Sequence, residues 1–209
     1  IEPQSSVCLA GPNGAGKSTL LLLLAGLLKG DGAIRIHGEP PDPGRNFGLV
    51  FQDADDQLFC PTVFEDVAFG PRNMGLNESE VADRVRESLD ATGLVGFDER
   101  SAHHLSEGEK KRAAIAAVLA CRPDILALDE PWANLDARGC RSVSEIIRNF
   151  SGTRLIASQD LHHAADVCDE MIILDNGALA ERGHMRDQIA RAERLEKHGL
   201  EVAARCRFC

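Results

Sequence analysis

The segment from Gly11 to Thr19 holds the residues of this chain that are best placed for chemistry. It reads GPNGAGKST and fits the pattern G-x-x-x-x-G-K-[ST]. Glycines in such a loop let successive backbone N–H groups curl around phosphate oxygens, and the helix that follows adds partial positive charge. Lys17 would reach the β- and γ-phosphates of a nucleotide, and the Ser18 hydroxyl would bind Mg²⁺. We predict a phosphate-binding loop formed by Gly11, Pro12, Asn13, Gly14, Ala15, Gly16, Lys17, Ser18 and Thr19.

A pair of carboxylates, Asp129 and Glu130, follows the apolar run from Ile125 to Leu128. Parallel sheets bind their ligands at the carboxyl ends of the strands, which is where this pair would lie. Asp129 suits the metal ion, directly or through water, and Glu130 suits a general base that polarises a water attacking the γ-phosphate. Because Pro131 follows, the pair also fits the start of a helix. Beside a phosphate loop we favour the catalytic interpretation.

The elements that must position these residues alternate between strands and helices, as in a parallel sheet. We predict strands at Val7 to Ala10, Ala33 to His37, Phe47 to Phe51, Asp124 to Leu128, Arg154 to Ser158 and Met171 to Leu174. We predict helices at Lys17 to Leu28, Asn77 to Thr92, from Ser106, at Asp136 to Phe150 and at Leu161 to Val167. The first of these is leucine-rich and should be buried, whereas the part from Arg186 resembles a solvated helix.

Composition narrows the class of protein. The chain has 209 residues, of which 44% are hydrophobic, so one main domain with a substantial core is expected. The 23 Lys and Arg residues are outnumbered by 33 acidic ones, and the net charge of -10 argues against a surface for nucleic acid. The longest apolar run, Leu20 to Leu28, is far shorter than the roughly 20 residues that cross a bilayer. The beginning of the chain lacks the pattern of a signal peptide, so an intracellular location is expected.

The seven cysteines are odd in number and scattered among apolar neighbours, which is typical of reduced thiols. Only Cys206 and Cys209 have the spacing of metal ligands. One such pair is half a zinc site, so we expect no zinc there.

Four further segments complete a pattern along the chain. Gln52 follows a strand, LSEGEKKR begins at Leu105, and ANLD spans Ala133 to Asp136. The segment SQD, Ser158 to Asp160, ends the next strand. With the phosphate loop and the carboxylate pair, their order and spacing resemble the ATP-binding subunits of ABC transporters over nearly the whole chain. In addition, the segment from Phe51 to Leu76 resembles the cobalt-type ATPases of energy-coupling factor transporters, which import vitamins and transition metals.

This resemblance implies an α/β P-loop NTPase fold with a mainly parallel sheet, a small helical subdomain and a truncated antiparallel β subdomain. We expect a single ABC ATPase domain over residues 1–209, with the helical insert at roughly 62–120 and a C-terminal helical tail at 186–209. In the family, an aromatic residue on a strand before the phosphate loop stacks on adenine. Only ten residues precede Gly11 and the chain has no tyrosine, so that strand is expected to be missing and no adenine contact is assigned.

The resemblance also implies roles for single residues. Gln52 would contact Mg²⁺ and the attacking water, and Asp136 would lie at the interface with a second ATPase subunit. Ser106, Gly108 and Glu109 begin a helix that would face the γ-phosphate held by that subunit. The two subunits, identical or different, would enclose two ATP molecules head to tail. Ser106 and Glu109 also fit a capping box, and Asp136 fits a helix N-cap, so each has a structural alternative.

A membrane subunit is implied as the second kind of partner. Its coupling helices would contact roughly Phe51 to Gly70, which would make this chain a peripheral protein on the cytoplasmic face of the membrane. Within that stretch, core packing is the alternative for Phe59, Phe64 and Phe69, and we expect at least two of the three to be buried.

Three positions depart from the family pattern. Glu107 replaces a glycine and Glu109 a glutamine, which would weaken closure on ATP unless Glu107 points outward and Glu109 is occupied by the cap. Gln159 replaces a histidine that grips the γ-phosphate. A glutamine amide can accept a hydrogen bond from water and donate one to phosphate, so we predict a catalytic role for Gln159. His162 and His163, on the next helix, are alternatives for that role, and Trp132 has no assigned role.

The sequence therefore predicts an ATPase that powers import of a metal ion or vitamin through a separate membrane subunit. One alternative is a regulatory subunit of a heterodimer that binds ATP but hydrolyses it poorly. The other is a soluble ABC ATPase acting on DNA or ribosomes, against which stand the acidic balance and the short spacing between Gln52 and Ser106.

Overall fold

The computed structural model describes residues 1–36, 38–40 and 46–200, which fold around one sheet. The strand order is β2-β3-β4-β1-β5-β6. The strands are β1 Ser6–Ala10, β2 Phe47–Val50, β3 Ile125–Asp129, β4 Thr153–Ser158, β5 Glu170–Asp175 and β6 Ala178–His184. Neighbouring strands are parallel except for β5 and β6, which pair in antiparallel fashion at one edge. The predicted mainly parallel sheet with a small antiparallel part is confirmed.

Both faces of the sheet are covered, which explains why its strands are continuous apolar runs. Along β1, Val7 and Leu9 pack with helix α1, Lys17–Leu24, on one face. Cys8 and Ala10 pack into the larger core on the opposite face. That face is covered by helices that include α5 Ala137–Asn149 and α6 Leu161–Ala165. The alternation of side chains along each strand thus divides the core in two.

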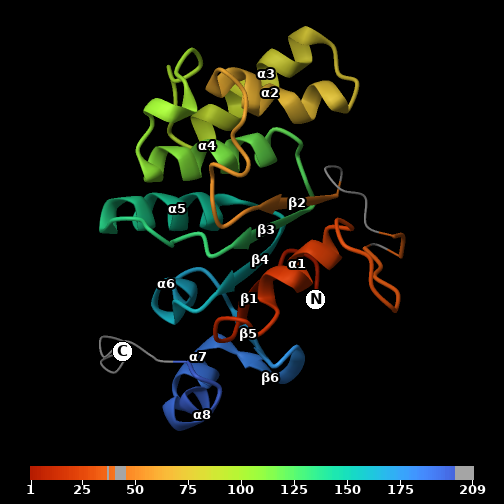
Figure 1. Cartoon of the computed structure of the whole chain (residues 1–209), viewed down its shortest axis with the longest axis vertical. Helices are drawn as coiled ribbons and strands as arrows, with labels where there is room; N and C mark the ends of the chain where they lie inside the picture. Colours follow the sequence, from red (N-terminus) through yellow and green to blue (C-terminus); the bar gives the residue numbers. More distant parts are fainter. Residues whose placement is uncertain (37, 41–45, 201–209) are drawn as a thin grey trace.

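A group of helices gathers beside β2 at one end of the molecule (Figure 1). It comprises α2 Val63–Asn73, α3 Glu78–Ala91, the short 3-10 turn η1 Ala102–His104 and α4 Glu107–Leu119. Helix α3 begins with a capping box: Asn77 accepts from the Glu80 N–H, and Glu80 accepts from the Asn77 N–H. These helices lie within the stretch predicted as a helical insert, whose limits at 62 and 120 remain a prediction.

The predicted strand at Ala33 to His37 is wrong for the residues that the structure describes there. Ile36 makes only an isolated bridge with Glu39, and the run joins no sheet. A strand needs a neighbour to satisfy its backbone hydrogen bonds. Gly32 and Gly38, with φ of +117° and +88°, turn the chain on either side of this run. The run therefore does not lie alongside a neighbouring strand.

The leucine-rich helix is shorter and less buried than predicted. It ends at Leu24 rather than Leu28 because the chain turns at Gly26, whose φ is +73°. Leu21 is buried, but Leu27 and Leu28 are exposed. The leucines beyond the turn therefore do not contribute to the core.

The end of the described chain also differs from the prediction of one solvated helix. Two short helices, α7 Met185–Ile189 and α8 Ala192–Lys197, lie at the end of the molecule opposite to α2 and α3 (Figure 1). They are docked rather than solvated, because Met185 and Leu195 are buried in the core.

The cysteines of the described chain, Cys8, Cys60, Cys121, Cys140 and Cys168, are all free. Cys206 and Cys209 lie outside the described residues, so the expectation about zinc stays untested. Over the ranges that the structure covers, no helix combines the length and the apolar character needed to span a bilayer.

Candidate nucleotide-binding site

Parallel pairing brings four predicted segments to one edge of the sheet. β1 lies between β4 and β5, and β4 lies between β3 and β1. The carboxyl ends of β1, β3 and β4 lead into Gly11, Glu130 and Gln159, while β2 leads into Gln52. A parallel sheet places its ligands at this edge. The residues predicted from separate parts of the sequence therefore approach one another for a topological reason.

The phosphate loop has the backbone that its glycines allow. Gly16 caps α1 with a φ of +98°, a left-handed conformation that side chains disfavour. Gly11 has no room for a side chain, since a Cβ there would lie 2.5 Å from the carbonyl oxygen of Leu174. Ser18 is exposed at the start of α1. The loop thus presents the beginning of a helix and the Ser18 hydroxyl to solvent.

Lys17 is buried beside this loop, with 6% of its surface exposed. Its Nζ donates to the carbonyl oxygens of Gly11 and Pro12 at 2.7 and 3.3 Å. It also lies 3.5 Å from Oε1 of Glu130. The ammonium group is therefore already directed along the loop and toward the carboxylate.

Glu130 is held from three sides. Its Oε2 accepts from the Ser158 hydroxyl at 2.9 Å, and its Oε1 accepts from the Gln159 N–H at 3.1 Å. The third contact is the Lys17 ammonium. The backbone at Glu130 is left-handed, with a φ of +42°, which a non-glycine residue rarely adopts. The Glu130 carboxylate thus contacts both Lys17 of the phosphate loop and the end of β4, which goes beyond the role of a helix cap.

Ser158 was not predicted as a site residue. It is fully buried at the end of β4 and connects Glu130 to the turn at Asp160, whose N–H donates to the Ser158 hydroxyl at 3.0 Å. A polar residue that ends a buried apolar strand was the available signal, because such a group needs a partner.

Asp129 is 8% exposed, and its Oδ1 has no hydrogen-bond partner among the described residues. A buried carboxylate oxygen without a donor is costly, so it fits a site for a cation. Carboxylate and hydroxyl oxygens are ligands that Mg²⁺ prefers. Asp129 and Ser18 therefore have the right chemistry for the predicted metal.

The turn after β4 is supported by aromatic contacts. Asp160 caps α6 by accepting from the N–H groups of His162 and His163. The His163 ring lies 2.8 Å from Asp160 through Nδ1 and stacks on Trp132, with centroids 5.6 Å apart. Burial alone would raise the pKa of Asp160, but the hydrogen bonds from His163 and His162 bring it below its ordinary value. His163 thus supports the turn through Asp160 and Trp132, while Gln159 is exposed.

These contacts also give Trp132 a structural role. The indole is 5% exposed, and its Nε1 donates to the Ser144 hydroxyl of α5 at 3.0 Å. Trp132 therefore joins the loop after Glu130, α5 and the turn at Asp160.

The first turn of α4 forms a second group of predicted residues. The capping box is present: Glu109 accepts from both the N–H and the hydroxyl of Ser106, the latter at 2.7 Å. These two donors lower the pKa of Glu109. Glu107 lies 3.3 Å from Lys110 on its own helix.

The same turn of α4 meets the start of α5. A Cβ on Gly108 would lie 3.8 Å from Cα of Gly139, so the two helices approach closely there. Asp136 caps α5 by accepting from the Gly139 N–H at 2.7 Å. A cavity of about 470 Å³ is lined by residues of both turns, among them Ser106, Gly108, Glu109, Asp136 and Arg138. None of the lining residues belongs to the phosphate loop, so these predicted residues form a separate surface.

Gln52 is exposed, and its backbone carbonyl accepts a hydrogen bond from the buried ammonium of Lys111 on α4. Burial lowers the pKa of Lys111. Lys111 was not among the predicted residues, because nothing in the local sequence distinguishes it from a solvated lysine.

The expectation that at least two of the phenylalanines after Gln52 are buried is wrong. Phe59 is 65% exposed and Phe69 is 48% exposed, and their rings form an edge-to-face pair with centroids 5.0 Å apart. Only Phe64 packs against the core. Apolar pattern alone did not distinguish a buried side from an exposed side in this segment.

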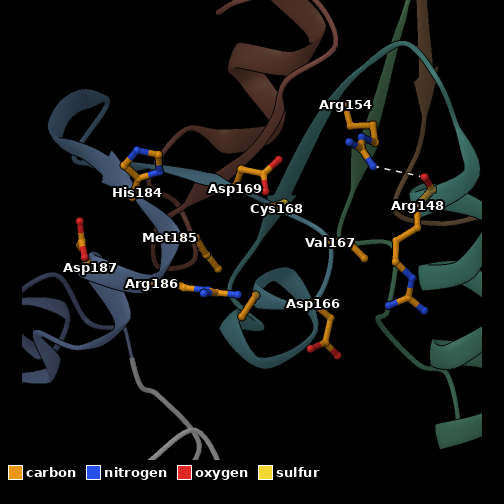
Figure 2. A pocket seen from close by; sticks show the side chains of 11 residues that line it. Arg148, Arg154, Asp166, Val167, Cys168, Asp169, His184, Met185, Arg186 and Asp187 are labelled. Atoms are coloured by element: carbon orange, nitrogen blue, oxygen red, sulfur yellow. Dashed lines mark hydrogen bonds between the residues drawn. The ribbon is translucent and has the colours of Figure 1, made fainter. Parts of the chain in front are cut away.

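A larger cavity, of about 690 Å³, lies elsewhere (Figure 2). It is lined where β4 and β5 begin and α7 starts, so it lies at the opposite edge of the sheet from the phosphate loop. Arg148, Arg154 and Arg186 line it together with Asp166, Asp169 and Asp187, which balances the charge of its lining. It contains no residue predicted for the site.

Residues 1–133 match a protein family described as ABC transporter. The energy-coupling factor transporter ATP-binding protein EcfA of Methanothermobacter thermautotrophicus is 42% identical, over 97% of this chain and 69% of its own length. EcfA1 of Methanospirillum hungatei is 41% identical, over 97% of this chain and 77% of its own length. Among solved structures, cbiO1 from Clostridium perfringens, described as part of the ABC transporter complex cbiONQ, matches with a TM-score of 0.79 at 36% identity, covering 94% of this chain and 84% of that one.

Proposed function

Because this chain belongs to the ABC transporter family and is an ATPase subunit of that family, we propose that it powers import of a metal ion or vitamin through a separate membrane subunit. The observation that supports this most directly is the exposed pair Phe59 and Phe69, which follows Gln52 and leaves an apolar surface uncovered. The names of the relatives support the same class: two are named energy-coupling factor transporter ATP-binding proteins, and cbiO1 is described as part of the ABC transporter complex cbiONQ.

The proposed reaction is in-line attack of water on the γ-phosphate of ATP, which releases ADP and phosphate. The new bond joins the water oxygen to the γ-phosphorus, and the bond to the bridging oxygen of the β-phosphate breaks. Glu130 polarises the water and accepts its proton. The Ser158 hydroxyl and the Gln159 N–H supply hydrogen bonds that orient this carboxylate.

The phosphates are bound by the loop from Gly11 to Thr19. Lys17 compensates the charge of the β- and γ-phosphates, and its present partners are the neutral carbonyls of Gly11 and Pro12 together with Glu130. A phosphate oxygen is a stronger acceptor than a carbonyl, so ATP draws Lys17 away from them. Mg²⁺, when bound, neutralises charge on the phosphates; Asp129, Ser18 and Gln52 would hold it.

We also propose that two such subunits meet head to tail over ATP. Ser106, Gly108, Glu109 and Asp136 form a surface apart from the phosphate loop, so within one chain they have no phosphate to contact. A second subunit, identical or different, would supply it. Glu109 and Glu107 are each occupied, by Ser106 and by Lys110, which limits their repulsion of an approaching phosphate.

The membrane subunit is the proposed partner of the segment from Phe51 to Gly70, and this places the chain peripherally on the cytoplasmic face of the membrane. Phe59 and Phe69 would be covered on assembly. Burying apolar surface of this size contributes roughly 1.5 to 3 kcal/mol for each large side chain.

Co-purification with a polytopic membrane protein from membranes of the source cell tests the proposal. We expect the wild-type chain to retain such a protein, and the Phe59→Ser/Phe69→Ser variant to lose it while keeping its ATPase rate. Val95→Ser is the matched control, since Val95 is 70% exposed but lies outside this segment. Retention of nucleic acid instead of a membrane protein would favour the soluble alternative.

A second candidate is a slow, regulatory member of a heterodimer. It is favoured by the hydrogen bond from Ser106 to Glu109, which occupies the hydroxyl that would face the phosphate, and by Gln159 in place of a histidine. Mixing the chain with the other ATPase subunit of its transporter and measuring ATP turnover separates the two candidates. The heterodimer is supported if the mixture turns over ATP faster than either subunit alone.

A further inference from the structure

Lys111 is a buried lysine whose ammonium serves the backbone of a distant segment. It lies in α4 and is 3% exposed. Its Nζ donates to the carbonyl oxygen of Phe51 at 3.2 Å and to that of Gln52. These two carbonyls follow β2, at the edge of the sheet where the phosphate loop lies. One side chain thus joins helix α4 to Gln52, the residue proposed to contact the metal.

Two other contacts fasten the same segment to α4. The Gln57 side chain accepts from the Phe51 N–H at 3.2 Å and donates to the Ala114 carbonyl at 3.4 Å. Lys110 binds Asp55 at 2.8 Å. Lys111 is distinguished from these contacts because it alone binds the carbonyl of Gln52 among the hydrogen bonds of the described chain.

A buried ammonium group is a costly way to fill space. Removing it from water is unfavourable, and an apolar side chain of similar volume would avoid that cost. What the apolar side chain cannot do is donate to two carbonyls at once. The arrangement is therefore better explained by the backbone that it holds than by packing.

We propose that Lys111 is a positioning residue for ATP hydrolysis: it holds the backbone at Phe51 and Gln52, so that the Gln52 side chain keeps a set relation to the first turn of α4. This inference rests on the proposed role of Gln52 at the metal and the attacking water. When α4 moves with Ser106 at its start, the segment after β2 moves with it. Lys111 does not itself contact the reacting atoms.

The test compares Lys111→Met with the wild type in the full chain. Methionine keeps the length and burial of the side chain but donates no hydrogen bond. We expect the Mg²⁺ concentration for half-maximal ATPase to rise by about tenfold, as for loss of a hydrogen bond from a charged donor. We also expect faster amide hydrogen exchange in residues 51–57 of the nucleotide-free protein, because the Phe51 and Gln52 carbonyls lose their donor.

Two further variants complete the experiment. Lys110→Met removes the neighbouring ion pair with Asp55 and should change the Mg²⁺ requirement by less than about twofold, because such pairs contribute little. Lys111→Gln retains an N–H donor and should recover part of the wild-type behaviour; it also decides the question if Lys111→Met does not fold.

Unchanged exchange and Mg²⁺ requirement in Lys111→Met, or an equal effect of Lys110→Met, would overturn the inference. So would a fall in activity that only follows a fall in melting temperature. Failure of the proposed function is distinguishable, because it would be seen as a wild-type Mg²⁺ requirement that does not respond to Gln52→Ala.

Discussion

The carboxyl edge of the sheet and the first turn of α4 both carry predicted phosphate contacts, but they are built differently. At the sheet edge, Lys17 is buried, and Lys17 and Glu130 are oriented by partners at or just after the ends of β1 and β4 and by each other. At α4, Ser106 is exposed, and both its hydroxyl and its N–H donate to the carboxylate of Glu109, three residues further along the chain. The groups at the sheet edge are oriented before any ligand binds, whereas the polar groups at the start of α4 already form hydrogen bonds with one another.

The difference indicates which existing contacts ATP must displace when it binds. Binding at the sheet edge needs only the redirection of Lys17. Contact at α4 needs a phosphate to compete with Glu109 for Ser106, and the competing group carries a negative charge. Closure of two subunits over ATP should therefore be the weak step, and chemistry at the oriented carboxylate the strong one.

Loss of the oriented carboxylate should have the largest effect. Glu130→Gln removes the proposed base but keeps the shape of the side chain, so we expect the ATPase kcat to fall by about 100-fold or more. ATP affinity should change little. Glu99→Gln, on an exposed loop, is the control. A Glu130→Gln enzyme with wild-type kcat would remove the first region from the chemistry.

Changes at Gln159 should come next. Gln159→Ala removes the side chain but leaves the N–H that binds Glu130, and we expect kcat to fall by about tenfold. Gln159→His should raise kcat, because a protonated imidazole can compensate the charge of the γ-phosphate. Steady-state phosphate release measures both. Unchanged rates in both variants would exclude Gln159 from the mechanism.

The hydrogen bond between Ser106 and Glu109 in the first turn of α4 can be weakened with Glu109→Gln. This removes a charge and a strong acceptor, so the ATP-dependent dimer should tighten by about fivefold, measured by sedimentation in the Glu130→Gln background. Glu107→Gln is matched in charge but leaves the bond between Ser106 and Glu109, and should have a smaller effect. Equal effects of the two would mean that net charge, not the hydroxyl, limits closure.

The buried support of the first region can be weakened at Trp132. Trp132→Phe loses the hydrogen bond to Ser144 and part of the stack on His163, so the free energy of unfolding should fall by about 1 kcal/mol. Urea unfolding measures this. Adding Ser144→Ala should cost little more, since its partner is already gone. A full additional loss would show that the two groups do not interact.

The smallest effect concerns pH. Donors from Ser106 lower the pKa of Glu109 in the folded chain. The capping box therefore stabilises α4 at pH values above the ordinary pKa of a glutamate, about 4.3. This contribution is lost as the pH falls through the lowered pKa. Carboxyl NMR of Glu109 should titrate below the ordinary range, and in Ser106→Ala it should move back toward it. An unchanged midpoint would contradict the assignment of Ser106 as the cause.

Some parts of this molecule could be predicted because they depend on neighbours in the sequence. The phosphate loop, the capping boxes at Asn77 and Ser106 and the cap at Asp136 each involve residues within one or two turns. The parallel sheet followed from apolar runs that alternate with helices. The failure at Ala33 to Ile36 arose because no strand pairs with this run, and the failure at Leu27 and Leu28 arose because the chain turns at Gly26.

Other parts depend on contacts between distant segments. Ser158 binds Glu130, Trp132 stacks on His163, and Lys111 reaches Gln52, each across a long stretch of chain. No spacing rule joins such residues, because the sheet topology decides which strand ends are adjacent. The exposure of Phe59 and Phe69 likewise depends on what α2 and its neighbours leave uncovered.

The sequence by itself determined which chemistry this chain carries: glycines, a lysine and two carboxylates in an order that binds and cleaves a phosphate anhydride. Only the tertiary structure decided how those groups are supported: that Glu130 is oriented by the end of β4, and that Lys111 holds the backbone of Gln52. The reason is physical. Reactive groups are recognised by type and local spacing, but their orientation depends on buried hydrogen bonds whose partners meet only when the strands pair.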